Sequence, residues 1–324
     1  MNAKQLYQRQ QVIEKTFNLL RLQHKSLSTE RTYLRWIGSY IDWLVSHGRG
    51  LADSRARMEA YLSSLARRGL SASTQNQAFN ALLYLYQQVK KEHLGEIHAL
   101  RAKRSRTLRT ALSKPDTLAL LDRVQDEAGY PTRLIARLLY GCGLRVSEPL
   151  NLRVKDLDAA HSRLMIRGAK GGKDRIVRVP CSLMVALLEQ MKFAKAIWQR
   201  DAANGLPVQL PGELARKYPR APFAWQWAFV FPAHQPCHHP RTCQRVRYRM
   251  HECHVQRAVK KAARALDLDA LATPHVLRHC YATHVIESGA HVRDVQEALG
   301  HSHLDTTMVY VRPQSERVLS PLEV

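Results

Sequence analysis

Apolar residues recur every three or four positions through the N-terminal part of the chain, and this spacing predicts amphipathic helices. The clearest repeat covers residues 28–47 and stops at Gly48. Two more cover about 53–68 and a stretch that begins near residue 73, and a weaker repeat covers 12–22. The N-terminal part is therefore predicted to be a bundle of four helices, a pattern that by itself indicates no function.

The rest of the chain continues with helical spacing, interrupted by less regular stretches. Helices are predicted near 116–128 and 131–140, and again at 182–199 and 252–266. Short helical pieces follow from residue 275 onwards. A second, mostly helical domain is therefore expected.

Two stretches of this second domain have a different character. Residues 163–167 and 175–179 have strand character, and the glycine-rich residues 168–174 between them predict a hairpin loop. Residues 201–228 are rich in Pro, Gly and Trp and are too long for an ordinary connection, which indicates an insert. The expected fold class is mainly α, of the α+β kind, with a four-helix N-terminal domain and a helical domain that holds a small antiparallel sheet.

A stretch of like charge lies between the two regions. Residues 100–109 are rich in basic side chains and poor in apolar ones, as a solvated linker is. The basic residues are Arg101, Lys103, Arg104, Arg106 and Arg109. We expect a helical domain at 1–98, a basic linker at 99–113 that follows a phosphate backbone, and a second domain at 114–324 with the insert at about 201–228.

The net charge favours a polyanionic partner. In 324 residues, 50 Lys and Arg stand against 27 Asp and Glu, which gives a formal charge of +23 and a pI near 10.2. Basic groups that neutralise phosphates release condensed counterions, so nucleic acid is the expected partner, although ribosomal and membrane-surface proteins share this excess. No run reaches the ~18 apolar residues of a membrane span, and the N-terminus has no signal-like apolar stretch. We expect a cytoplasmic protein with no membrane partner.

Cysteine usage points away from disulfides and from a metal. The six cysteines are scattered, which indicates reduced thiols. Several Cys and His residues gather between Cys237 and His254, but no C-x-x-C pair is present and the gaps are irregular. We therefore expect no metal and no cofactor.

Three separated blocks together suit phosphoryl transfer. Arg145 lies in Gly-Leu-Arg-Val-Ser-Glu, and His275 and Arg278 share one side of a helix at positions i and i+3. His301 ends Leu-Gly-His, and Tyr310 follows nine residues later. Guanidinium groups hold phosphate oxygens bidentately and neutralise charge in the transition state, and a phenol can be a covalent nucleophile. The sequence has no Asp-rich cluster and no Gly-x-x-x-x-Gly-Lys-Ser/Thr loop, so it indicates neither a two-metal nuclease nor an ATPase.

In order and spacing these blocks resemble those of the tyrosine recombinase (phage integrase) family. The resemblance spans the second domain, and the N-terminal bundle is similar to the family's core-binding domain. Each residue alone could be a structural pair or a solvated contact, but the ordered set is improbable by coincidence. The resemblance implies an enzyme that cleaves and rejoins DNA and needs neither metal nor ATP.

The resemblance also implies a role for each matching residue. Arg145 and Arg278 would clamp the scissile phosphate, and Tyr310 would attack it to form a 3′-phosphotyrosine. His275 would assist proton transfer from the nucleophile, and His301 would hydrogen-bond the phosphate.

A lysine on the hairpin loop completes the set. Lys170 resembles the general acid that protonates the leaving 5′ oxygen. Lys173 in the same loop is an alternative for this role, and otherwise a DNA contact. Glu148 would orient its neighbours rather than react.

The insert resembles the one that marks integron integrases. Those enzymes integrate and excise gene cassettes at attC and attI sites, and they recognise attC as a folded single-stranded hairpin with extrahelical bases. Trp225 and Trp227 offer flat faces on which an unpaired base can stack. They alternate along a stretch expected to be extended, so we predict that one faces inward and that Trp227 faces outward. The alternative is that they pack the insert onto the domain.

Three further residues are candidate base contacts. Integron integrases carry Arg-His-His shortly before a Gln-Arg-Ala-Val helix, and alignment on Gln256 puts Tyr248 and Arg249 at the two His positions. This is a departure from the pattern, although Tyr and Arg can also stack on a base. Pro240 is the third candidate.

The expected partners are DNA, as an attC-like hairpin and as duplex sites, and further copies of the chain in a homotetramer on DNA. Three other functions stay open. The chain could be a Xer- or phage-type recombinase acting on duplex sites, a catalytically inactive DNA-binding relative, or a type IB topoisomerase.

Overall fold

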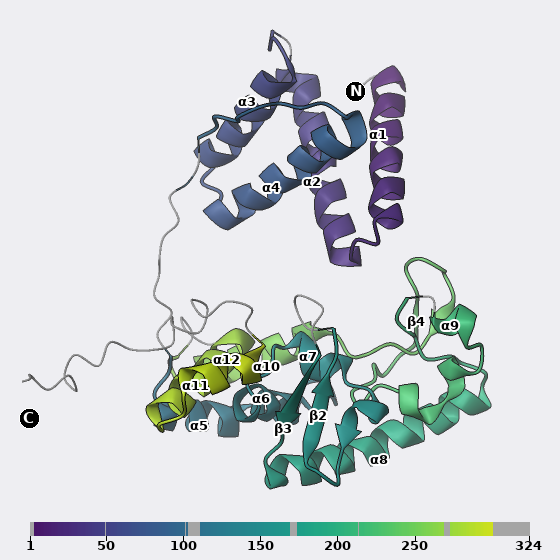
Figure 1. Cartoon of the computed structure of the whole chain (residues 1–324), viewed down its shortest axis with the longest axis vertical. Coiled ribbons are helices and arrows are strands. Elements are labelled where there is room, and N and C mark those ends of the chain that lie inside the picture. The colour runs from purple at the N-terminus through teal and green to yellow at the C-terminus, as the bar shows by residue number, and fades with distance from the viewer. Residues whose placement is uncertain are drawn as a thin grey trace, which may run out of the picture. The chain divides into compact units, whose positions relative to one another are not determined.

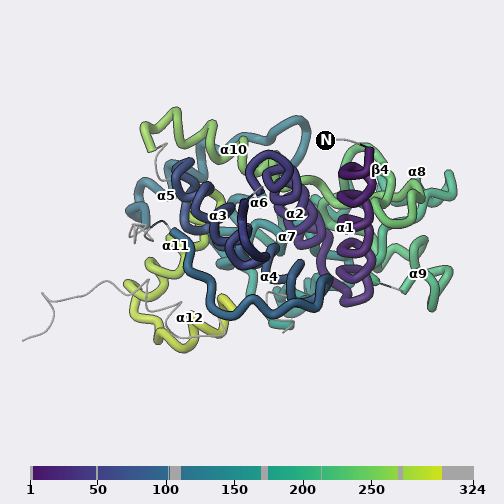
Figure 2. Tube along the Cα trace, turned by 90° about the horizontal axis from the view of Figure 1, so that it is seen from above, coloured from purple at the N-terminus to yellow at the C-terminus, as the bar shows by residue number. Residues whose placement is uncertain are grey.

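Helices dominate both parts of the chain in the computed structural model (Figures 1 and 2). The chain divides into two units, Met1–Leu108 and Arg109–Val324. The residues that the structure describes are 3–48, 50–100, 102, 111–168, 174–212, 214–268 and 273–300.

The four helices predicted for the N-terminal unit are present. They are α1 (Ala3–Leu22), α2 (Leu27–His47), α3 (Ser54–Arg67) and α4 (Ala72–Tyr84), and a π-helical turn, η1 (Leu85–Lys90), continues α4. Side chains before α2, α3 and α4 accept a hydrogen bond from a first-turn backbone N–H, which fixes where each helix begins. These N-caps are Ser26, Asp53 and Ser71.

Three buried tyrosines lie at the centre of this bundle. Tyr40, Tyr61 and Tyr86 are at most 1% exposed, and the hydroxyls of Tyr40 and Tyr86 lie 2.6 Å apart in a hydrogen bond. Burial in apolar surroundings requires such a partner for a phenol. The periodic apolar residues of the sequence thus form one hydrophobic core within this unit.

The second unit is also mainly helical, around a small sheet. Its helices are α5 (Lys114–Arg123), α6 (Thr132–Gly141), α7 (Ser147–Asn151), α8 (Cys181–Ala203), α9 (Leu214–Lys217), α10 (Glu252–Arg264), α11 (Pro274–Glu287) and α12 (Val292–Leu299). The α6 helix packs against α5, α8, α10 and α11. Its apolar residues Ile135, Leu138 and Leu139 are completely buried there.

The predicted hairpin is the main part of an antiparallel sheet. The sheet has the order β1 (Leu157–Asp158), β2 (Arg163–Ile166), β3 (Arg175–Arg178), and Leu164 lies opposite Val177. A second hairpin, β4 (Cys237–His238) with β5 (Arg245–Val246), was not anticipated. The mainly helical fold with a small antiparallel sheet is confirmed.

The insert is more regular than expected. The α8 helix runs on to Ala203, and the region beyond it holds α9 and two 3-10 turns, η3 (Ala221–Phe223) and η4 (Trp225–Trp227). The prediction that the two tryptophans alternate along an extended stretch, one inward and Trp227 outward, is wrong: both are half-buried. Trp227 N donates to Ala224 O and Ala228 N donates to Trp225 O, so bonds of the i to i+3 kind tighten the backbone into a turn.

A buried ion pair fastens the C-terminal end of α8. Asp201 and Arg247 are each 4% exposed, and Arg247 Nη2 donates to Asp201 Oδ1 over 2.7 Å. Arg247 Nη1 also donates to the carbonyls of Ala233 and His234. The pair therefore holds the segment before α10 against α8.

No helix among the described residues is long and apolar enough to cross a membrane.

Arg247→Ala should lower the free energy of unfolding by roughly 3–5 kcal/mol, because removal of one partner leaves the buried Asp201 charge uncompensated. Urea unfolding measures the loss. Arg245→Ala, two residues away, is the matched control, since Arg245 is exposed, and it should change the unfolding free energy by less than about 0.5 kcal/mol. Equal stability of the two variants would contradict the argument.

Candidate active site

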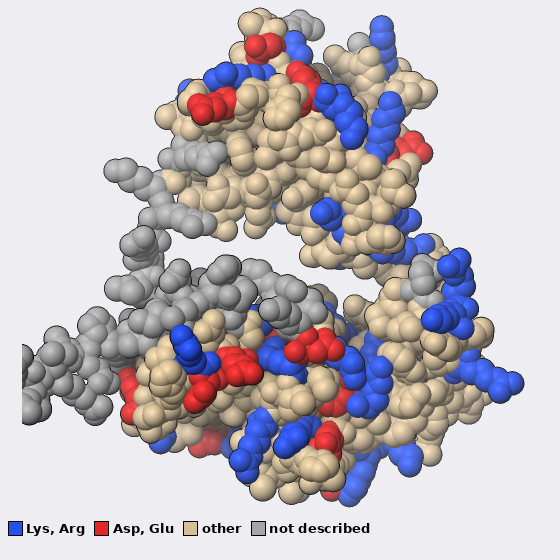
Figure 3. Space-filling model, viewed as in Figure 1, with Lys and Arg blue, Asp and Glu red and all other residues tan. Residues whose placement is uncertain are grey.

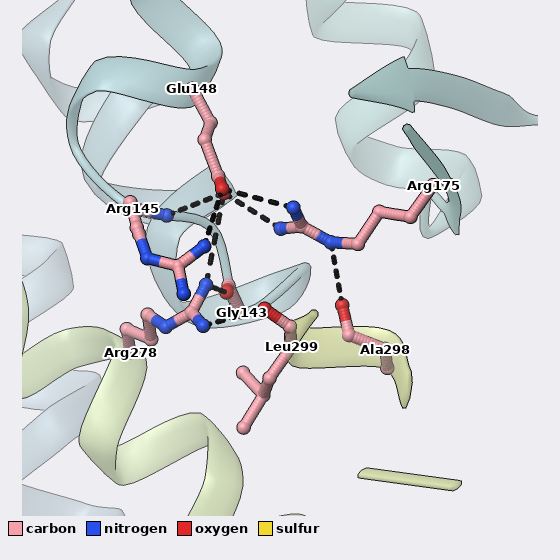
Figure 4. A network of polar contacts seen from close by, with 7 residues as sticks. All are labelled: Gly143, Arg145, Glu148, Arg175, Arg278, Ala298 and Leu299. Atoms are coloured by element: carbon pink, nitrogen blue, oxygen red, sulfur yellow. Dashed lines mark hydrogen bonds and ion pairs between the residues drawn. The ribbon is translucent and has the colours of Figure 1, made fainter. Parts of the chain in front are cut away.

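The loop between α6 and α7 brings two of the predicted arginines together. Gly143 in this loop has φ +62°, and an added Cβ would lie 2.5 Å from the ring of Tyr281. Only glycine adopts this backbone at low cost and leaves room for the tyrosine. The Gly143 carbonyl accepts a hydrogen bond of 2.7 Å from Arg278 Nη1, so the loop that presents Arg145 is bonded to α11 (Figure 4).

Glu148 lies at the centre of this arrangement (Figure 4). Its carboxylate accepts from the backbone N of Arg145 at 2.8 Å and from the guanidinium of the same residue at 2.9 Å. It also accepts two bonds, of 2.7 and 2.9 Å, from Arg175, and lies 3.7 Å from Arg278. Three guanidinium groups thus surround one carboxylate.

The charge state of Glu148 follows from these neighbours. Burial of the side chain opposes ionisation, but the hydrogen bonds and charge of Arg175, together with Arg145 and Arg278, outweigh it. The pKa of the Glu148 carboxyl is therefore lowered from its ordinary value. The group stays a carboxylate at neutral pH, and the cluster of three cations and one anion keeps a positive excess that suits a phosphate.

Arg278 and Arg145 differ in their surroundings. Arg278 is 1% exposed, and its two terminal nitrogens donate to the carbonyls of Gly143 and Leu299, each over 2.7 Å. The Arg145 side chain is 24% exposed and lines a cavity of about 310 Å³ together with Ser147 and Asn151. Arg145 is thus the arginine that faces an open space large enough for a phosphate group.

Arg175 is the participant that the sequence reasoning missed. Its side chain is 9% exposed and its Nε donates to Ala298 O, at the C-terminal end of α12, over 2.9 Å. Gly300, which ends α12 with φ +64°, has the Arg175 side chain 3.2 Å from where a Cβ would stand. One signal was present. Exposed and buried residues alternate along β2, and Arg175 pairs with Ile166, which is one of the buried residues.

The remaining catalytic candidates divide into two groups. His275 is described, and it lies exposed in the first turn of α11, one turn before Arg278. The others, Lys170, Lys173, His301 and Tyr310, lie outside the described residues. So do the linker residues, which are Arg101, Lys103, Arg104, Arg106 and Arg109.

Most of the candidate base contacts belong to one row of neighbouring cations and aromatic rings. Lys155 Nζ lies 3.2 Å from the Trp227 ring centroid. The Arg153 guanidinium carbon lies 6.0 Å from the Trp227 centroid and 3.9 Å from the Phe229 centroid. The ring of Tyr248 lies 5.7 Å from that of Phe229. Arg249, 5.6 Å from the Tyr248 ring, ends the row. We call these six residues the cation–aromatic row; Lys155, Arg153 and Phe229 in it were not predicted.

The other two candidates lie elsewhere. Trp225 packs against Trp198 with ring centroids 5.5 Å apart, so it has an aromatic partner within the protein. Pro240 is exposed in the hairpin between β4 and β5. Among the described residues, no group of three or more His, Cys, Asp or Glu side chains is placed to hold a metal ion.

Comparison with known proteins shows the family. Residues 110–317 match the phage integrase family, and residues 12–96 match the SAM-like N-terminal domain of phage integrases. The chain is 40% identical over 319 residues to an integrase/recombinase of Escherichia coli, covering 96% of this chain and 93% of the relative. It is 30% identical over 308 residues to tyrosine recombinase XerD of Rhizobium meliloti, covering 90% and 86%.

Solved structures show the same fold. A lambda integrase dimer bound to a COC′ core site aligns with a TM-score of 0.61 at 16% identity, covering 97% of this chain and 80% of that one. The recombinase XerH bound to its difH substrate aligns with a TM-score of 0.61 at 19% identity, covering 98% and 87%. The chain belongs to the phage integrase family of tyrosine recombinases and is a site-specific DNA recombinase.

Glu148→Gln should slow DNA cleavage on the order of tenfold or more, or ~1.4 kcal/mol and above, because the neutral amide no longer balances the charges that orient Arg145. It should also lower the free energy of unfolding by about 2 kcal/mol or more. Single-turnover cleavage and thermal unfolding measure the two effects. Glu189→Gln is the control, since Glu189 is exposed and pairs only with Lys192 among the described contacts; a Glu148 variant that matches it in both assays would contradict the role.

Proposed function

We propose that the chain is an integron integrase, which excises and integrates gene cassettes at attC- and attI-type sites. The observation that carries the proposal is the cation–aromatic row. It contains three residues selected as base contacts from the sequence, Trp227, Tyr248 and Arg249. Stacking on aromatic rings and guanidinium planes is the way in which proteins bind unpaired bases.

Within the row, Trp227 is better suited than Trp225 to accept a base. Trp225 has a tryptophan as its partner, whereas the nearer of two cations at the Trp227 ring is the ammonium of Lys155, on a flexible side chain. Burial lowers the pKa of Lys155, with Arg167 and Arg153 adding to this and Asp156 opposing it. A nucleotide stacked on Trp227 would bring a phosphate to this crowded cation and relieve the repulsion.

The chemistry that we propose uses the residues of the site in sequence. Arg145 and Arg278 neutralise the scissile phosphate, and His301 adds a hydrogen bond to it. The Tyr310 oxygen attacks phosphorus and gives its proton up with help from His275. The bond between phosphorus and the 5′ oxygen breaks as Lys170 protonates that oxygen. The phosphotyrosine conserves the energy of the broken bond, so the reverse attack by a 5′ hydroxyl reseals the strand.

Charge on the surface supports DNA as the partner. Exposed basic residues follow one face of α10 at helical spacing, and they are Arg257, Lys260, Lys261 and Arg264. Lys and Arg also gather at the edge of the second unit that carries α9 and the end of α8 (Figure 3). Such surfaces track a phosphate backbone. Among solved structures of the same fold, XerH is bound to its difH substrate and a lambda integrase dimer to a COC′ core site. A tetramer of this chain on two DNA sites would supply four active sites.

A Xer-type recombinase that acts on duplex sites is the second candidate. The similarity to the XerD recombinase of Rhizobium meliloti favours it. It differs from the first candidate in its substrate and not in its chemistry, so a comparison of substrates separates them. An integron integrase should form covalent complex on one strand of a folded attC hairpin, whereas a Xer-type enzyme should form it only on a duplex site.

Tyr310→Phe should form no covalent complex with DNA while it keeps its affinity for DNA within about twofold. The hydroxyl is the nucleophile, but the affinity comes from phosphate contacts made by many Lys and Arg side chains. A suicide substrate followed by denaturing gel electrophoresis detects the complex, and a mobility-shift titration gives the affinity. Phosphotyrosine found in this variant would refute the assignment of Tyr310, and absence of complex in the unmodified protein as well would refute a recombinase acting on that site.

Trp227→Ala should weaken binding to a hairpin that has unpaired bases roughly five- to 150-fold, which corresponds to ~1–3 kcal/mol per stacked base. Binding to the same hairpin without those bases should hardly change. Trp225→Ala is the matched control: it removes the contact with Trp198, so it should lower the melting temperature and affect both hairpins alike. If Trp227→Ala behaves like this control, the base contact and with it the integron reading is wrong.

A further inference from the structure

Asp156 is a buried carboxylate that joins two parts of the second unit. It is 4% exposed and lies in the 3-10 turn η2 (Val154–Asp156). Its Oδ1 accepts from Arg167 Nε over 2.6 Å, and its Oδ2 accepts from the backbone N of Arg153 over 3.0 Å. The hydrogen bond with Asp156 raises the pKa of Arg167. A short charge-assisted bond to a buried acceptor fixes the direction of the Arg167 side chain.

Arg167 belongs to the end of the β2–β3 hairpin. It directly follows β2, and its Nη1 lies 3.5 Å from Asp174 on the other side of the hairpin. The backbone N of Gly168 also donates to Asp174 Oδ1 over 2.9 Å. The two residues that flank positions 169–173 are thus bonded to each other, and Arg167 connects both to Asp156.

The other end of this connection is a firmly paired segment. Val154 N donates to Ala228 O, and Val230 N donates to Leu152 O, each over 3.0 Å. The Arg153 guanidinium donates to Trp227 O over 2.7 Å. Burial lowers the pKa of Arg153 to about 10 and the charge of Asp156 opposes this. Asp156 therefore stands on a segment that is held in place by pairing with residues 227–230, which supply Trp227 and Phe229 to the cation–aromatic row.

The same connection forms a wall of the active-site cavity. Asp156, Arg167 and Gly168 line the cavity that also holds Arg145 and Glu148. The direction in which the hairpin end approaches Arg145 thus depends on the bond between Arg167 and Asp156.

We propose that Asp156 is a positioning residue for protonation of the leaving group. By holding Arg167, it sets the hairpin end at the active-site cavity, and the hairpin carries Lys170. The inference rests on the proposed function, in which Lys170 gives its proton to the 5′ oxygen as the bond from that oxygen to phosphorus breaks. Asp156 does not touch the DNA and exchanges no proton.

A DNA substrate with sulfur in place of the scissile 5′ oxygen tests the proposal. A thiolate leaves without a proton, so the substrate no longer needs a general acid. Asp156→Asn should slow single-turnover cleavage of the normal substrate at least tenfold, and cleavage of the thio substrate by no more than about threefold. Lys170→Ala is the reference and should show the same rescue from a larger defect, on the order of 100-fold or more. DNA affinity should be unchanged in both.

Two further variants keep the test decisive. Arg167→Lys retains the positive charge but removes the Nε donor to Asp156. Because the Arg167 side chain is half exposed, this variant should fold even where Asp156→Asn does not. It should show the same selective rescue. Asp158→Asn, two residues away, is the matched control, because Asp158 is exposed and its bonded partner is His161; it should cleave both substrates at the unmodified rate.

The outcomes separate the two proposals. Equal slowing on both substrates would show that Asp156 supports the fold in general, and no slowing on either would show that it is dispensable; each overturns the inference. If the unmodified protein forms no covalent complex on either substrate, the proposed function fails. If it does form one, the assignments of Lys170 and Asp156 are tested separately: absence of rescue in Lys170→Ala refutes Lys170 as the acid and the inference with it, and absence of rescue in Asp156→Asn alone refutes only the inference.

Discussion

One buried carboxylate, that of Glu148, organises the cluster of arginines in the second unit. Three guanidinium groups from three separate parts of the chain converge on it: Arg145 from the loop after α6, Arg175 from β3 and Arg278 from α11. Without it, three like charges would lie close together in a poorly hydrated place, where their repulsion is strong. With it, each arginine has a fixed direction and the cluster still carries net positive charge.

This arrangement resolves a conflict that any phosphate site faces. Arginines that bind a phosphate must be close together before the phosphate arrives, and a buried counter-charge makes this possible. Too many counter-charges would cancel the attraction for DNA. The chain has a formal charge of +23, and in this cluster a single carboxylate, Glu148, faces three arginines. Backbone carbonyls of Gly143, Ala298 and Leu299 take up further N–H groups without adding a full negative charge.

Sequence reasoning reached the parts of the structure that depend on local pattern. Three N-terminal helices begin directly after Ser26, Asp53 and Ser71, because a short polar side chain there accepts from a first-turn backbone N–H, and such caps can be recognised in a sequence. Arg145 and Arg278 were found because each lies in a motif of fixed local spacing. The first helix was predicted too short, since its exposed N-terminal part, with Leu6 and Tyr7, has no clear apolar stripe.

Other features depend on contacts between distant residues, which local spacing does not encode. Arg175 looks like an ordinary strand arginine until α7 and α12 bring Glu148 and Ala298 to it. The Trp-Gln-Trp segment alternates like a strand, yet bonds of the i to i+3 kind turn it, and Arg153 then anchors its carbonyl. The π-helical turn after α4 is likewise set by packing, with Leu85 and Tyr86 buried in the bundle.

The cation–aromatic row and the arginine cluster are not independent sites, because consecutive residues of one short segment serve both. Arg153 lies in the row, Asp156 is three residues further on, and Leu152 and Asp156 line the cavity that contains Arg145. Backbone pairing with 228–230 fixes residues 152–154, and Asp156 follows in the same short turn, so the two ends of this segment cannot shift independently. The row and the cavity are therefore placed relative to each other by the same few backbone bonds, and this makes the end of the insert part of the architecture of the candidate active site rather than an appendage to it.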